Sequence, residues 1–227
     1  MRRPATPHSR AGRPPTVSRA QILKAARRII DRDGWQKLTI RRLAAEIGVG
    51  AATLYHHVRD KEDLLVQLLS DYADQIARPR LPMDPRDRIV AAATAMHDAL
   101  AAWPQAAEIL TADDILGESA LWMVDTIVGS AIECGCTPEQ AVDLYRSLWY
   151  YTVGEILVRA HARRRAEEER PRYRDTVFKR LDASRFPSLA PLGDRWPQLT
   201  SRDTYRQGLR AFVDGLLAHQ KPIDPSL

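Results

Sequence analysis

The chain has 227 residues, a net charge of +5, 44% hydrophobic and 28% charged residues, and two cysteines. The hydrophobic content is sufficient for a buried core, and the length suits one large domain or a small domain followed by a medium one. Two cysteines exclude a disulfide framework and suit a reducing compartment. The apolar run 89–103 is too short to span a membrane, and no apolar stretch follows Arg2-Arg3 as a leader would require. We therefore expect a cytoplasmic protein without a membrane partner.

Charge is distributed unevenly along the chain. Residues 1–59 hold thirteen lysines and arginines against three acidic residues, a net charge of +10, so the remainder carries −5. Positive charge concentrated at one end is typical of a polyanion binder, most simply a DNA-binding protein. A solvated basic tail would carry the same charge, and the charge distribution alone does not separate these interpretations.

The N-terminal third predicts a basic arm followed by a small helical domain over 16–78. Residues 1–15 are rich in proline, arginine and small residues without apolar periodicity, which predicts a disordered arm. Its Gly12-Arg13-Pro14 stretch suits either contact with a DNA minor groove or a solvated tail. Apolar residues at helical spacing predict helices over 18–33, 39–48, 50–58 and 60–76, and prolines break the pattern at 78–82.

The remainder, residues 84–227, predicts a second and larger helical domain. Helices are expected over 84–103, 104–113, 118–134, 137–169 and 201–219, with at most a short helix over 174–181 in the proline- and arginine-rich stretch 170–200. Asp84-Pro85 and Thr137-Pro138-Glu139-Gln140 are typical helix starts. Because no stretch shows sustained period-two alternation, the predicted fold class is all-α.

The segment 38–61 reads as helix, glycine, helix. Gly48 can adopt the left-handed backbone of a tight turn between two closely packed helices, and Ala44 and Ala45 suit that close packing. The second helix begins with small residues, which lets its N-terminus enter a DNA major groove, where Thr53 can contact a base or a phosphate. Thr39 is expected to cap the first helix. The predicted DNA-contacting residues are Thr39, Arg41, Arg42, Ala51, Ala52, Thr53, Tyr55, His56, His57 and Lys61.

Short matches to one known pattern recur without a gap in residues 18–76. They are Asp33-Gly34, Leu38-Thr39, Ile40, Leu43-Ala44, Gly48-Val49, Thr53-Leu54-Tyr55, His57-Val58, Lys61 and Leu64-Leu65. With them the segment resembles the tetracycline-repressor (TetR) family of bacterial regulators. The resemblance implies a helix-turn-helix DNA-binding domain, then a helical ligand-binding and dimerisation domain. It also implies a homodimeric repressor that binds a near-palindromic operator on double-stranded DNA and is released by a small-molecule effector. After residue 76, histidines are not found at the places where tetracycline repressors hold a metal–drug chelate, so an effector other than tetracycline is expected.

Bulky side chains between 84 and 160 suit either core packing or an apolar pocket for an apolar or aromatic effector. His97, Asp113 and Glu155 are polar groups among apolar neighbours, and they suit either ligand contact or solvent-facing and interface positions. A DNA reader alone needs only residues 18–76, which favours a second function for the remainder. The candidate ligand-binding residues are His97, Trp103, Asp113, Trp122, Met123, Trp149 and Glu155.

Two helices, over 137–169 and 201–219, carry apolar stripes that predict a four-helix interface between two copies. These stripes are Leu144 and Leu148 on the first helix, and Leu209, Phe212, Val213 and Leu216 on the second. No nucleophile–base set, carboxylate pair or phosphate-binding glycine loop is recognisable, so we expect no enzyme activity, cofactor or metal. Cys134 and Cys136 lack further cysteines or nearby histidines, which favours idle thiols over a metal site or a redox sensor.

Overall fold

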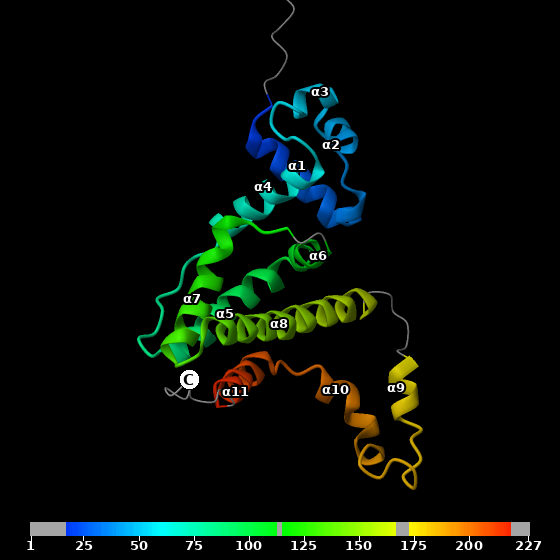
Figure 1. Cartoon of the computed structure of the whole chain (residues 1–227). Helices are drawn as coiled ribbons and strands as arrows, with labels where there is room; N and C mark the ends of the chain where they lie inside the picture. The colour runs from blue at the N-terminus through cyan, green and yellow to red at the C-terminus, as the bar shows by residue number, and fades with distance from the viewer. Residues whose placement is uncertain (1–16, 113–114, 167–172, 219–227) are drawn as a thin grey trace, which may run out of the picture. The chain divides into compact units, whose positions relative to one another are not determined.

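The computed structural model describes residues 17–112, 115–166 and 173–218, and these ranges contain helices and no strand, as the all-α prediction requires. The chain divides into two compact units, residues 1–68 and 69–227, whose helices are labelled in Figure 1. The boundary falls inside helix α4 (Lys61–Asp74), earlier in the chain than the proline-rich break at 78–82. The predicted arm over 1–15 lies outside the described residues.

The first unit consists of short helices whose ends follow local sequence signals. It contains α1 (Arg19–Asp33), the 3-10 helix η1 (Trp35–Lys37), α2 (Ile40–Ile47), α3 (Ala51–Leu54) and the first part of α4. Ser18 and Gln21 form a capping box at the start of α1, because each side chain accepts a hydrogen bond from the other residue's backbone N–H. Gly34, at φ 87°, ends the helix. The predicted helix over 50–58 is too long, since α3 stops at Leu54 and the chain continues in a turn.

Aliphatic side chains from all the α-helices of the first unit fill its core. Burying a leucine or isoleucine side chain of this kind contributes about 1.5–3 kcal/mol, so the core determines where the short helices lie. The fully buried members are Ile22, Ile29, Ile30, Leu38, Leu43, Leu54, Leu64 and Leu65. Ala44 of α2 is buried as predicted, but Ala45 is exposed, so only the first alanine supports the close helix packing.

The second unit is built on long helices. They are α5 (Pro85–Ala102), α6 (Pro104–Ala112), α7 (Leu121–Glu133), which the 3-10 helix η2 (Glu118–Ala120) precedes, α8 (Pro138–Ala166) and α11 (Tyr205–Ala218). The predicted starts of α5 and α8 are confirmed. Asp84 accepts from the Asp87 N–H at 2.9 Å, and Thr137 and Gln140 cap each other reciprocally at 2.9 and 3.2 Å.

Helices α5, α7 and α8 pack against one another, and α11 covers α5 and α8 to complete one hydrophobic core (Figure 1). Leu144, Leu148, Leu209 and Val213 are buried in this core. For these four of the six predicted residues, the predicted interface between copies is therefore wrong, because they face the other helices of the same chain. Phe212 and Leu216 are partly buried and pack against the same core. Apolar periodicity identifies a buried face but does not say what buries it.

The stretch 173–200 is more structured than its proline and arginine content predicts. It forms α9 (Tyr173–Phe178), the 3-10 helix η3 (Ala190–Arg195) and α10 (Trp196–Thr200), which pack together. The rings of Phe178 and Trp196 stack with centroids 4.1 Å apart. A Cβ at Gly193 would lie 2.3 Å from the Phe178 carbonyl oxygen, so only glycine fits this contact. Aromatic stacking and one small residue thus replace the helical periodicity that the sequence lacks here.

Candidate nucleic-acid interface

Helices α2 and α3 form a helix-turn-helix whose turn depends on one glycine. Gly48 has φ 79° and ψ 33°, a left-handed conformation that a residue with a β-carbon adopts only at a cost. The backbone N–H groups of Gly48 and Val49 both donate to the Ala44 carbonyl, at 2.9 and 3.0 Å, and this ends α2. Leu54 and Val58 anchor α3 and the turn after it in the core. The predicted glycine turn is confirmed.

The outward face of α3 is small at its start and aromatic at its end. Ala52 is exposed, and Ala51 and Thr53 are partly exposed, so nothing bulky projects at the N-terminus of the helix. Tyr55, 57% exposed, follows at the C-terminal end. A short helix with a small leading face can approach base edges closely, while a tyrosine hydroxyl can donate to a phosphate. His56 is exposed and His57 is partly exposed.

The two arginines of α2 have different environments. Arg41 is exposed, and no ion-pair partner of its side chain is found in the described part of the chain. Arg42 donates to Asp33 at 2.5 Å, joining α2 to the end of α1. Arg32 adds a second link at 3.2 Å to Glu46, and this guanidinium lowers the pKa of the Glu46 carboxyl. A phosphate contact from Arg42 would have to share its guanidinium with Asp33, whereas Arg41 is available.

Thr39 and Lys61 stand at the N-terminal ends of α2 and α4. The Thr39 Oγ1 accepts from the Arg42 N–H at 3.1 Å, which confirms the predicted cap, and its hydroxyl proton remains available to an acceptor. The Lys61 Nζ lies 4.8 Å from the ring centroid of Trp35, a cation–π contact that restricts where this ammonium group points. The sequence pattern marked Lys61 but did not reveal the role of Trp35.

Two further residues of α4 hold the segment that follows α3. Gln67 donates through Nε2 to the His57 carbonyl at 3.1 Å, and the Asp63 carboxylate accepts from the Arg59 N–H at 2.8 Å. That backbone hydrogen bond lowers the pKa of Asp63. The sequence did not reveal either contact, because neither a carboxylate nor a glutamine amide carries a signal that names its partner.

In the second unit, the polar candidates His97 and Glu155 contact each other. The His97 Nε2 lies 3.0 Å from a Glu155 oxygen, and its Nδ1 lies 3.2 Å from an Asp98 oxygen. The His97 ring stacks on Tyr205 with centroids 3.7 Å apart, and Arg159 pairs with Glu155. Both ring nitrogens thus face carboxylates, so a ligand that binds His97 has to replace one of them.

The Tyr205 hydroxyl extends this cluster into the core. It lies 2.7 Å from the hydroxyl of Thr152, which is fully buried. Burial raises the pKa of Tyr205 because its anion would lose solvation there. Residues of α5, α8 and α11 are therefore joined by one hydrogen-bonded and stacked cluster.

The apolar ligand candidates lie in several environments. Trp103 is buried and meets Tyr72 edge to face at 5.1 Å, and Met123 is buried in α7. Trp122 is partly buried, with the Arg78 Cζ 5.4 Å from its ring centroid. Trp149 of α8 is also partly buried. Asp113 lies outside the described residues. The structure does not gather these side chains around one described cavity.

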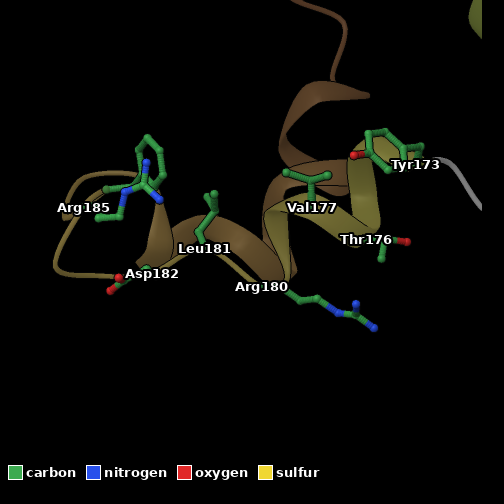
Figure 2. Close-up of a pocket in the computed structure, with 8 residues that line it drawn as sticks. Tyr173, Thr176, Val177, Arg180, Leu181, Asp182 and Arg185 are labelled. Atoms are coloured by element: carbon green, nitrogen blue, oxygen red, sulfur yellow. The ribbon is translucent and has the colours of Figure 1, made fainter.

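A groove of about 340 Å³ lies elsewhere, on α9 and the segment after it (Figure 2). Its lining residues were not among the predicted site residues. Tyr173, 84% exposed, stands at one end, and the side chains of Val177 and Leu181 project between it and Arg185. The remaining lining residues are Thr176, Arg180, Asp182 and Phe186.

Cys134 is exposed and Cys136 is buried, and burial raises the pKa of both thiols, which disfavours the reactive thiolate. Within the described ranges, no three histidine, cysteine or acidic side chains are grouped as a metal site would require. A search of the described helices finds none with the length and apolar character needed to cross a membrane.

A left-handed glycine turn between two short helices, with a small leading face on the second, defines a helix-turn-helix DNA-binding protein. Comparison with known families agrees. Residues 22–68 match the family model "Bacterial regulatory proteins, tetR family", and residues 78–220 match "Tetracyclin repressor-like, C-terminal domain". The chain therefore belongs to the TetR family. It is a DNA-binding transcriptional regulator and not an enzyme, as the sequence predicted.

Relatives and solved structures with similar sequence or fold cover most of the chain. The transcriptional repressor DrrR1 of Streptomyces coeruleorubidus is 29% identical over 90% of this chain and 79% of its own. The TetR family protein ActR of Streptomyces coelicolor, solved with actinorhodin, is 24% identical with a TM-score of 0.70 over 89% of this chain and 96% of its own. BioQ, solved with its natural double-stranded DNA operator, is 23% identical with a TM-score of 0.60 over 89% of this chain and 99% of its own.

Proposed function

We propose that this regulator is a homodimeric repressor that binds a near-palindromic operator and is released by a small-molecule effector. The observation that carries the proposal is the exposed, small-to-aromatic face of α3, held on a glycine turn in a strongly basic segment. Such a face fits the major groove, and the surrounding positive charge attracts phosphates. A regulator of this class works where the bacterial chromosome lies, in the cytoplasm.

The DNA contacts are assigned by exposure and chemistry. Base-edge contacts fall to Ala51, Ala52 and Thr53, because they lead α3. Phosphate contacts fall to the polar and basic groups around them. These are Thr39, Arg41, Tyr55, His56, His57 and Lys61, with Arg42 in a positioning role through Asp33.

Recognition of a specific DNA sequence by α3 favours a dimer. One α3 helix covers too few base pairs for specificity, whereas a two-fold pair reads two half-sites about 34–36 Å apart, or a multiple of that spacing. The interface cannot consist of Leu144, Leu148, Leu209 and Val213, which are buried in the subunit. The outward sides of α8 and α11 remain for this role, including Val142, Tyr150 and Val158, which are 47%, 61% and 69% exposed.

An effector is proposed to bind the second unit. The solved complex of ActR with actinorhodin supports a small-molecule ligand by analogy of fold. The proposed contacts are His97, Trp103, Asp113, Trp122, Met123, Trp149 and Glu155. Because Glu155 already contacts the His97 Nε2, an effector that binds this nitrogen would break the link between α5 and α8. An effector releases DNA only if it binds the non-binding conformation better, with a typical coupling of about 1–3 kcal/mol.

Selection of duplexes from a random-sequence library by the purified full-length chain tests the proposal. We expect the enriched sequences to share an inverted repeat. Light scattering of the DNA-free protein should show a dimer. The double variant Tyr55→Ala with Lys61→Ala is the control and should enrich nothing, because it removes two proposed DNA contacts. Its circular dichroism should match that of the unmodified chain. An enriched motif without two-fold symmetry, or a monomer at micromolar concentration, contradicts the homodimer. For the effector, calorimetry with Trp149→Ala and His97→Ala should show weaker binding than the unmodified chain.

A further inference from the structure

The segment that follows α3 is attached to α4 at two backbone groups. The His57 carbonyl accepts from the Gln67 Nε2 at 3.1 Å, and the Arg59 N–H donates to the Asp63 Oδ2 at 2.8 Å. Val58, between these two attachments, is buried in the core. A backbone held on both sides of a buried side chain has little freedom to shift, so α4 determines where residues 55–60 lie.

The Gln67 amide has only one orientation that satisfies its partners. Its Oε1 accepts from the Arg19 Nε at 2.9 Å, and its Nε2 donates to the His57 carbonyl and, at 3.3 Å, to an Asp63 oxygen. Arginine only donates, while a carbonyl and a carboxylate only accept. Rotating the amide by half a turn would oppose like groups at all three contacts. Gln67 therefore joins the start of α1, the segment after α3 and α4 through one side chain.

From these contacts we infer that Gln67 is a positioning residue for operator binding, an inference that rests on the proposed function. Helix α3 has only four residues, so it depends on its neighbours for its position. Leu54 anchors it in the core, and the Gln67 contact holds the segment that directly follows it. Tyr55 and Lys61, proposed to contact DNA, flank that attachment. A contact surface displaced by a fraction of an ångström loses specific binding before it loses the fold.

Two substitutions separate the hydrogen bonds of Gln67 from its bulk. Gln67→Met keeps an unbranched side chain of similar size and removes all three contacts. Gln67→Glu keeps an acceptor for Arg19 but places an oxygen against the His57 carbonyl and the Asp63 carboxylate. The matched control is Gln36→Met in η1, because this glutamine is exposed.

Binding is measured with a duplex that the unmodified chain enriches from a random library, and with a shuffled duplex of equal length. We expect Gln67→Met to bind the enriched duplex about five- to tenfold more weakly, the effect of losing hydrogen bonds that orient a contact. Gln67→Glu should be weaker still. The affinity of Gln67→Met for the shuffled duplex should match that of Gln36→Met, because neither substitution changes the charges that bind phosphates. A purely structural role would lower both affinities together with the melting temperature.

Hydrogen–deuterium exchange on the DNA-free protein gives an independent reading of the contact. We expect peptides over 55–60 to exchange about tenfold faster in Gln67→Met than in Gln36→Met, because their backbone opens more often. Unchanged exchange, or an unchanged preference for the enriched duplex, would overturn the inference. If the unmodified chain enriches no duplex while Gln67→Met exchanges faster, the attachment is real and the operator proposal fails instead.

Discussion

The two units of this regulator differ in how deeply their polar side chains reach into the core. In residues 17–68 the hydrogen-bonding side chains lie near the surface, where Gln67, Asp63 and Arg42 hold short helices against one another around an aliphatic core. In the second unit a polar cluster reaches inside, where Thr152 is fully buried against Tyr205. In the described part of the first unit, the core therefore consists of apolar side chains. The second unit places a hydrogen bond inside its core, where water cannot replace it.

This difference follows from the lengths of the helices. Helix α3 has four residues and α8 has 29. A four-residue helix forms too few backbone hydrogen bonds to be stable alone, so external contacts must hold it. Long helices are stabilised by packing over their whole length, and such a unit tolerates a buried polar cluster whose members satisfy one another. We expect substitutions in the first unit to affect DNA binding more than stability, and core substitutions in the second to do the reverse.

The largest expected effect is on the core of the second unit. Leu148→Ala should lower the free energy of unfolding by about 2–5 kcal/mol, because Leu148 is fully buried and its loss leaves a cavity. Urea denaturation followed by circular dichroism measures this. Val158→Ala on the same helix is the control, since Val158 is 69% exposed and should change stability by less than about 0.5 kcal/mol. An equally small change in stability for Leu148→Ala would instead support a position of Leu148 at an interface between copies.

A second prediction places the largest loss of DNA binding in the first unit. Tyr55→Ala should weaken operator binding by about 1–3 kcal/mol, measured by gel shift at fixed salt, because it removes a proposed DNA contact. Its thermal unfolding should change little, since Tyr55 is 57% exposed. Tyr173→Ala, at an 84% exposed tyrosine of the second unit, should leave binding unchanged. Equal losses of operator binding in Tyr55→Ala and Tyr173→Ala would show that DNA binding does not depend on the first unit more than on the second.

The buried cluster gives a third prediction. Thr152→Val should destabilise the protein by about 1–3 kcal/mol, because it leaves the Tyr205 hydroxyl buried without its 2.7 Å partner. Adding Tyr205→Phe should recover much of that loss, since removing both partners leaves no unsatisfied group. Thr126→Val is the matched control, because the Thr126 hydroxyl bonds within its own helix to the Trp122 carbonyl. Failure of the double variant to recover stability would show that packing, not hydrogen bonding, dominates here.

The smallest expected effect concerns pH and the first unit. The Arg59 N–H lowers the pKa of Asp63 below its ordinary value of 3.8. A carboxyl with a lowered pKa stabilises the folded state above its unfolded pKa, and this stabilisation is lost as the pH falls through the folded pKa. Asp63→Asn should therefore melt at a lower temperature than the unmodified chain at neutral pH, and the two should converge in acid. Glu62→Gln, an exposed change on the same helix, should show no such convergence.

Many features of the fold were predictable because their causes are local. Asp84 with Pro85, and Thr137 with Gln140, start α5 and α8 as predicted, since a cap involves residues only a few positions apart. The glycine turn at Gly48 was equally readable, because the left-handed backbone selects glycine. In the stretch 173–200 the short helix predicted over 174–181 is present as α9 (Tyr173–Phe178). The helices η3 and α10 were not predicted, because Phe178 and Trp196 stabilise this stretch by stacking across a gap in the sequence.

The sequence by itself therefore determined the helical class, most helix ends, the glycine turn and the charge that draws the N-terminal unit to DNA. The tertiary structure alone decided which polar groups meet. Examples are Gln67 with the His57 carbonyl, His97 with Glu155, and the hydroxyls of Thr152 and Tyr205. It also decided that Leu144 and Leu148 face their own subunit. The physical reason is that capping and periodicity act within one or two helical turns, whereas each of these contacts joins residues that only packing brings together.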